Sequence, residues 1–238
     1  MTATPARGPR EARVVRVTDE RTPIAREALE LIADAIGDVQ PINDLLSELE
    51  ERRLGLPSGG GYHLLARVDA AGGVTAAAAG TYLEKVNAGF ITYLAVRKDQ
   101  RSQRLGRALR KHLVDSIREE ARATRGEEPS WVVGEIRSDS PWLRTLVAAG
   151  RAVPFAFPYF HPWMTRAAEG RYVLYREPLG DVRRELPAQE VMGLVYAIWR
   201  RAYRIRFPLH SEIFRYMLQT IEAQGTIGPH PDFGVPAE

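Results

Sequence analysis

The sequence of 238 residues contains no cysteine. This absence excludes disulfide bonds, zinc sites with cysteine ligands and catalysis by a thiol nucleophile. No apolar run approaches the roughly 18 to 20 residues of a membrane-spanning helix, and the first residues, MTATPARGPREAR, lack the apolar core of a signal peptide. We therefore expect a cytoplasmic protein with no membrane partner and a flexible N-terminus over residues 1–11.

A strong excess of one charge is also lacking. The chain has 33 Lys and Arg against 30 Asp and Glu, a formal net charge of +3. Nucleic-acid binding needs basic side chains clustered on one face. Here the arginines that follow residue 105 alternate with acidic residues, and RRAYRIR at 200–206 is typical of a helix end that favours positive charge. We expect no nucleic-acid partner.

The sequence does contain a mixture of strand and helix patterns. Strands are predicted at 12–17, 62–68, 74–83, 90–96, 131–136, 155–160 and 171–176, and helices at 23–36, from 41, after 105, from 141 to Gly150, at 187–203 and at 211–221. The continuously apolar run FITYLAV at 90–96 predicts a central strand buried on both faces. The fold class is therefore mixed α/β (α+β), with helices packed on one sheet.

The sequence pattern changes near Gly180, because the elements predicted after it are helices only. We expect one domain over residues 12–178 and a helical C-terminal extension over 179–238. The extension is too short to be assigned as an independent domain. Two placements stay open: it packs on the main domain, or it forms the contact of a homodimer.

A basic loop joins the central strand to the next helix in LAVRKDQRSQRLGRAL, residues 94–109. A strand, a loop and a helix N-terminus present several unpaired backbone N–H groups at one point, and the helix dipole adds positive charge there. The residues that would supply amides and guanidinium groups are Arg101, Ser102, Gln103, Arg104, Leu105, Gly106 and Arg107. Taken alone, the loop is also compatible with a solvated turn whose arginines contact only water.

The same stretch resembles the acetyl-CoA-binding signature of the GCN5-related N-acetyltransferases, V-x-x-x-x-[QR]-x-x-G-x-[GA]. Val96, Arg101 and Gly106 occupy its first, second and last fixed positions. The family's order of elements also matches, over roughly residues 13–177. The resemblance implies a mostly antiparallel central sheet flanked by helices, acetyl-CoA as cosubstrate, and no metal.

The resemblance also assigns parts of the cofactor site. Leu94, Ala95 and Val96 would offer backbone hydrogen bonds to the acetyl carbonyl and the pantetheine arm, beside a strand that splays from the next one. One fixed glycine of the signature is Arg104 here. Glycine permits close approach of the backbone to the pyrophosphate and unusual dihedral angles. An arginine still offers its amide if its φ is negative.

Acid–base chemistry needs a group that takes the proton of an ammonium substrate. Glu135, late in the apolar strand WVVGEIR, is the first candidate, and an ion pair with Arg137 is its structural alternative. Glu84, at the end of a hairpin strand, is the second, and it is equally compatible with a solvated turn. Asp139 is expected to cap the helix that follows it.

The family often has a tyrosine that protonates the leaving thiolate. It lies four residues before the glycine that ends the helix predicted here from 141 to Gly150. Leu146 occupies that position. Tyr159 and His161, in the proline-flanked segment VPFAFPYFHPW, are the available replacements, although such a segment is also typical of an edge strand. Tyr82 and Tyr93 are further candidates for the acceptor site, bringing the acceptor-site candidates to four.

Two functions therefore follow from the sequence. The first is an acetyl-CoA-dependent N-acetyltransferase that moves an acyl group directly to a primary amine of a small molecule or a protein. The alternative is a catalytically impaired relative of the same fold that binds a ligand or a partner, because Arg104 and Leu146 depart from the family pattern.

Overall fold

The computed structural model describes residues 11–37, 39–56, 61–101 and 104–234. Its strands hydrogen-bond in the order β1-β2-β3-β4-β5-β7-β6, with a separate pair β8-β9. The β1–β2, β5–β7 and β6–β7 pairs are antiparallel and the β4–β5 pair is parallel. The expected fold class, a mixed and mostly antiparallel sheet flanked by helices, is confirmed.

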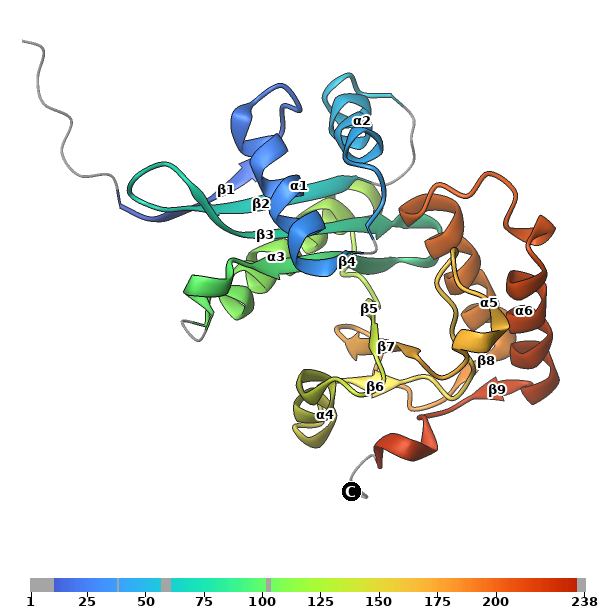
Figure 1. Ribbon diagram of the computed structural model, residues 1–238. Helices are drawn as coiled ribbons and strands as arrows, with labels where there is room; N and C mark the ends of the chain where they lie inside the picture. Colours follow the sequence, from blue (N-terminus) through green and yellow to red (C-terminus); the bar gives the residue numbers. More distant parts are fainter. Residues whose placement is uncertain (1–10, 38, 57–60, 102–103, 235–238) are drawn as a thin grey trace, which may run out of the picture. The chain divides into compact units, whose positions relative to one another are not determined.

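The chain divides into two compact units. The elements β3, β4 and α3 each begin in one unit and end in the other. The first unit covers residues up to 58, 62–80 and 93–116. Its elements are β1 (Arg13–Val17), α1 (Pro23–Ile36), α2 (Ile42–Arg53), β2 (Tyr62–Val68), the beginning of β3 (Val74–Leu83), the end of β4 (Ala88–Val96) and the beginning of α3 (Leu105–Arg125). Figure 1 labels each of them.

The core of the first unit lies between α1, α2 and the strands. Thr22 caps α1 by accepting a hydrogen bond from the backbone N–H of Ala25, and Pro23 occupies the first turn. Leu29 and Ile32 of α1 and Leu45 of α2 are fully or almost fully buried against the strands. These apolar positions recur at helical spacing, which explains why both helices were predictable from the sequence.

The second unit covers residues 59–61, 81–92 and 117–238. Besides the remaining parts of β3, β4 and α3, it contains β5 (Trp131–Arg137), α4 (Pro141–Ala148), β6 (Val153–Pro154), β7 (Tyr172–Pro178), β8 (Leu186–Pro187), α5 (Ala188–Ala197), α6 (Glu212–Gln224) and β9 (Thr226–Ile227). Its larger core joins residues of β4, β5 and β7 to α5 and α6, which lie side by side in Figure 1.

One predicted element in this unit is wrong, and one predicted helix changes type along its length. Residues 155–160 do not form a strand: β6 ends at Pro154, and the segment makes only isolated bridges at Phe155 and Tyr159 among the described residues. Pro158 lacks the N–H that a continuous ladder needs. The helix predicted at 187–203 stays α-helical only to Ala197 and then continues as a π-helix, Ile198–Ala202.

The helices of the C-terminal extension share their core with the strands of the second unit. Trp199, Phe214 and Met217 are buried together with Phe90 of β4 and Val133 of β5. The boundary near residue 178 and a homodimer contact stay predictions. No helix in the described part of the chain is long and apolar enough to cross a membrane.

Candidate active site

The basic loop begins where β4 ends. The backbone N–H of Arg97 still donates to Thr75 of β3 at 3.0 Å, and a short 3-10 helix, Lys98–Gln100, follows. At the other end of the loop, the first helical hydrogen bond runs from the N–H of Ala108 to the carbonyl of Arg104 at 3.2 Å. The amides of residues 105–107 therefore precede the first internal donor of α3. Ser102 and Gln103 lie outside the described residues.

Cationic side chains surround these amides. Arg101, Arg104 and Arg107 are all exposed. Arg97 instead forms an ion pair with Asp99, Nε to Oδ1 at 2.7 Å, which lowers the pKa of that carboxyl group and raises the pKa of the guanidinium. The loop thus combines helix amides with exposed guanidinium groups, the two kinds of donor that bind phosphate.

Arg104 has φ of +57°, in the left-handed region. The condition under which the arginine was expected to offer its amide, a negative φ, is therefore not met. The backbone has a conformation that favours glycine, and a side chain there costs about 1–2 kcal/mol. Arg104 thus occupies a position at which glycine would be free of this cost.

We expect Arg104→Gly to be more stable than Arg104→Ala. Both changes remove the guanidinium group, but only glycine relieves the positive φ, so the two variants isolate the backbone effect. The greater freedom of glycine in the unfolded chain offsets part of the gain, which leaves a difference of about 0.5–1 kcal/mol in the free energy of unfolding. Urea denaturation of the two variants measures it. Equal stability would show that the left-handed conformation is not strained in this loop.

A second cluster of candidate side chains surrounds Glu135 of β5, in the second unit. Tyr159 donates from Oη to Glu135 Oε2 at 2.5 Å, and the hydroxyl of Tyr203 donates to Oε1. Nε2 of His161 lies 3.5 Å from Oε1, and the Glu135 side chain is only 9% exposed. The structure therefore brings together the three sequence candidates Glu135, Tyr159 and His161, and adds Tyr203.

Aromatic rings enclose this cluster. The His161 ring lies 4.8 Å from the ring of Tyr203 and 4.8 Å from that of Trp163, measured between centroids. Tyr159 and Tyr203 are buried, whereas Trp163 is 54% exposed. The cluster therefore extends from a buried carboxylate to an indole at the surface.

Sequence reasoning missed Tyr203, which follows the π-helix. In the sequence this residue belongs to RRAYRIR, whose pattern indicates only a basic helix end. A π-helix needs one extra residue per turn and has no clear signature in apolar spacing. The buried, hydrogen-bonded position of Tyr203 is thus visible only in the structure.

The pKa of the Tyr159 hydroxyl lies well above its ordinary value of 10.0, first because of burial and then because of the charge of Glu135. Burial also raises the pKa of Tyr62. A proton held more tightly in the folded state contributes stability that is fully present below the unfolded pKa of about 10 and is lost as the pH rises through the folded pKa. We therefore expect the free energy of unfolding to fall above about pH 10.

Urea denaturation at about pH 9 and about pH 11 tests this expectation, with Tyr159→Phe as the matched variant. The variant should lose less stability on this pH change than the unaltered protein. An identical loss in both proteins would contradict a contribution from Tyr159.

Glu84, the second candidate base, is exposed in a short 3-10 helix, Glu84–Val86. Its carbonyl oxygen accepts a hydrogen bond from Nη1 of Arg125 at 3.1 Å. Arg125 is the last residue of α3, whereas the basic loop comes immediately before the first residue of that helix. The role of Glu84 as a base stays a prediction.

Two tyrosines that were candidates for the acceptor site hold local structure. Tyr82 donates from its hydroxyl to Oδ1 of Asn87 at 2.7 Å, and the hydroxyl of Tyr93 accepts a hydrogen bond from the backbone N–H of Gln40 at 3.1 Å. Both side chains are buried. The structure gives each hydroxyl a partner within its own unit.

Two expectations about the end of β5 are wrong. Asp139 does not cap α4, because Ser140 is the N-cap residue. Asp139 instead accepts hydrogen bonds from Nε and Nη2 of Arg137 at 3.0 and 2.7 Å. This pairing also replaces the ion pair between Arg137 and Glu135. Leu146 is 6% exposed within an apolar cluster, so it supplies no proton.

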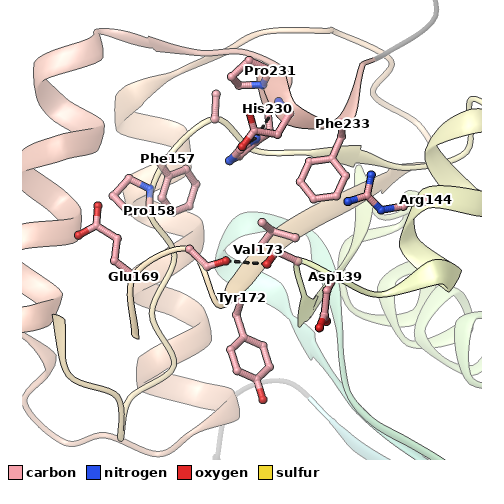
Figure 2. A pocket seen from close by; sticks show the side chains of 14 residues that line it. Asp139, Arg144, Phe157, Pro158, Glu169, Tyr172, Val173, His230, Pro231 and Phe233 are labelled. Atoms are coloured by element: carbon pink, nitrogen blue, oxygen red, sulfur yellow. Dashed lines mark hydrogen bonds and ion pairs between the residues drawn. The ribbon is translucent and has the colours of Figure 1, made fainter. Parts of the chain in front are cut away.

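A pocket of about 520 Å³ lies in the second unit and is lined by residues from 138–144, 156–158, 169–173 and 230–233. Figure 2 shows the guanidinium group of Arg144 directed toward the ring of Phe233, 5.8 Å from its centroid. Glu135, Tyr159, His161 and Tyr203 are not among the lining residues that the structure describes. Its lining residue Tyr172 bridges to Tyr159, so the pocket borders the Glu135 cluster without sharing these residues with it.

No family model and no curated protein matches the sequence. Solved structures do match the fold. The ribosomal-protein-S18-alanine N-acetyltransferase from Escherichia coli matches with a TM-score of 0.50 and 16% identity, over 74% of this chain and 98% of that one. A chain of the NatC complex bound to Gag peptide and CoA matches with a TM-score of 0.50 and 15% identity, over 71% of this chain and 99% of that one. The chain thus has the fold of the GCN5-related N-acetyltransferases.

Proposed function

We propose that the protein is an acetyl-CoA-dependent N-acetyltransferase that moves an acetyl or other acyl group directly from the CoA thioester to a primary amine. The observation that carries the proposal is the basic loop: within an acetyltransferase fold, β4 leads through exposed arginines to the N-terminus of α3, and Arg104 has a left-handed φ of +57°, which favours glycine. The acceptor is an amine of a small molecule or of a protein.

The residues of the basic loop fit the phosphates of CoA. The amides of residues 105–107 would bind the pyrophosphate, and Arg101, Arg104 and Arg107 would neutralise its charge. At Gly106 an added Cβ atom would lie 3.4 Å from Val96 Cγ2 and 3.9 Å from Leu94 Cδ2, so the start of α3 approaches the end of β4 closely. Glycine at this point keeps the backbone of the first turn accessible to a ligand.

The backbone of Leu94, Ala95 and Val96 would bind the thioester and the pantetheine arm. Parallel pairing joins Ala88–Ile91 of β4 to Trp131–Gly134 of β5, and both strands continue beyond the paired residues. Residues 94–96 therefore lie past the register that β4 shares with β5. A backbone N–H there would stabilise the oxyanion that forms when the amine attacks the thioester carbonyl.

Glu135 would act as the general base. Its carboxylate takes a proton from the ammonium group, the amine nitrogen forms a bond to the acyl carbon, and the bond from that carbon to sulfur breaks. The nitrogen gives up its second proton to form the neutral amide, and the CoA thiolate takes up one proton to leave as a thiol. Tyr159, which is hydrogen-bonded to Glu135 and keeps its proton through the neutral pH range, belongs to this proton-transfer cluster.

Calorimetry with purified protein tests the proposal. We expect acetyl-CoA and CoA to bind, and Arg101→Ala to bind them more weakly, because it removes one cation from the loop. The salt dependence of binding should also become less steep in this variant. A panel of primary amines assayed for thiol release then measures turnover. No binding of either ligand at millimolar concentration would overturn the proposal.

The second candidate function is a module of the same fold without catalysis. Leu146 favours it, because a buried leucine occupies the position of the tyrosine that protonates the thiolate in the family pattern. Binding of CoA without thiol release from any amine in the panel would support this candidate. Measurable turnover would remove it.

A further inference from the structure

Tyr203 stands on the C-terminal extension, outside the stretch that resembles the acetyltransferases, yet it contacts the candidate base. Its hydroxyl donates to Oε1 of Glu135, while Tyr159 donates to Oε2, so each carboxylate oxygen has its own tyrosine. We infer that Tyr203 is a positioning residue that fixes the orientation of the Glu135 carboxylate for proton transfer. This inference rests on the proposed function.

The backbone around Tyr203 is shaped for this contact. The π-helix Ile198–Ala202 ends with the N–H of Tyr203 donating to the carbonyl of Ile198 at 3.1 Å. The N–H of Ile205 then donates to the carbonyl of Trp199 at 2.9 Å. Arg204, which lies between Tyr203 and Ile205 in the chain, has a left-handed φ of +56°. A π-helix and a non-glycine residue with positive φ both cost free energy, and both are frequent at functional sites.

The surroundings of Tyr203 hold its ring in place. The ring makes edge contacts with Phe90 at 5.9 Å and with Trp163 at 5.6 Å between centroids, and the side chain is buried. A ring held on several sides offers its hydroxyl in one direction. Two fixed donors leave the carboxylate of Glu135 little freedom to rotate, and a base in fixed orientation transfers protons faster than one that must first reorient.

Tyr203→Phe tests the inference, because phenylalanine keeps the ring contacts and removes only the hydroxyl. We expect kcat to fall about 10- to 100-fold while the KM for acetyl-CoA stays unchanged, since the basic loop is not altered. Tyr216→Phe, on the same extension as Tyr203, is the matched control, because its hydroxyl lies 3.4 Å from the exposed carboxylate of Glu169.

The stability of Glu135→Gln, Tyr203→Phe and the double variant completes the test. A coupling of about tenfold in the unfolding equilibrium constant is expected for the hydrogen bond. No coupling would overturn the contact, and coupling with an unchanged kcat in Tyr203→Phe would overturn the positioning role alone. Absence of CoA binding and turnover in the unaltered protein would instead overturn the proposed function, and the positioning role with it.

Discussion

Glu135→Gln is expected to lower kcat by about 10²- to 10⁴-fold, the usual contribution of a general base. Glutamine has nearly the same shape as glutamate but cannot take the proton of the ammonium group. The affinity for CoA, measured by calorimetry, should stay unchanged because the basic loop is intact. A rise in kcat with pH in the variant would follow, since only amine molecules that are already deprotonated would react.

Glu84→Gln is the competing variant in the same assay. Glu84 is exposed and Glu135 is enclosed by two tyrosines and a histidine, so the two carboxylates differ in environment although both precede a turn of the chain. We expect the loss in Glu135→Gln to exceed that in Glu84→Gln by at least tenfold. The reverse order would assign the proton transfer to Glu84.

Gly134→Ala is expected to destabilise the protein by about 2 kcal/mol, within the range for overpacking a core. An added Cβ atom would lie 2.5 Å from the hydroxyl oxygen of Tyr175 and 2.7 Å from Cζ, closer than real contacts permit. Tyr175 is the cross-strand partner of Gly134 on β7, and its buried ring covers the glycine. The ring also contacts Trp142 at 5.9 Å, which restricts its movement away from the new methyl group.

Urea denaturation measures this loss, and Gly180→Ala is the control. The nearest atom to an added Cβ at Gly180 is the carbonyl oxygen of Pro129 at 3.6 Å, an ordinary contact. We expect the control to change stability by less than about 0.5 kcal/mol, as surface substitutions usually do. Equal effects of the two alanines would show that the ring of Tyr175 moves aside without cost.

The sequence predicts most of the elements because their apolar spacing is regular. The buried side chains Leu109, Leu113, Ile117 and Ala121 recur every four residues, and the helix α3 contains all of them. Pro23 and Thr22 likewise predict the start of α1. The strand predicted at 155–160 is wrong because of the prolines. The aromatic run there has strand propensity, but a proline has no N–H with which to continue the hydrogen-bond ladder.

The candidate site was predictable in its residues and not in its contacts. Glu135 stands out as a carboxylate late in the apolar strand WVVGEIR, and the proline-flanked aromatics indicate a shaped segment. That Tyr159 donates to Glu135, and that Tyr203 does so from a residue 68 positions along the chain, depends on tertiary packing. Neither the π-helix nor the positive φ of Arg104 has a counterpart in residue spacing.

The hydrogen bond from Tyr203 also orders events during synthesis of the protein. Glu135 gains Tyr159 after 24 further residues but Tyr203 only after 68. Chains emerge from the N-terminus at about 5–20 residues per second, so the second donor arrives several seconds after the strand that carries the carboxylate. Until then Oε1 lacks its tyrosine donor, and the apolar side chains of β5 and β7 that pack with α5 and α6 are not yet covered by them. The packing of α5 and α6 onto these strands is therefore a late step in folding. Before it, the nascent chain has apolar side chains uncovered and is open to aggregation and to binding by chaperones.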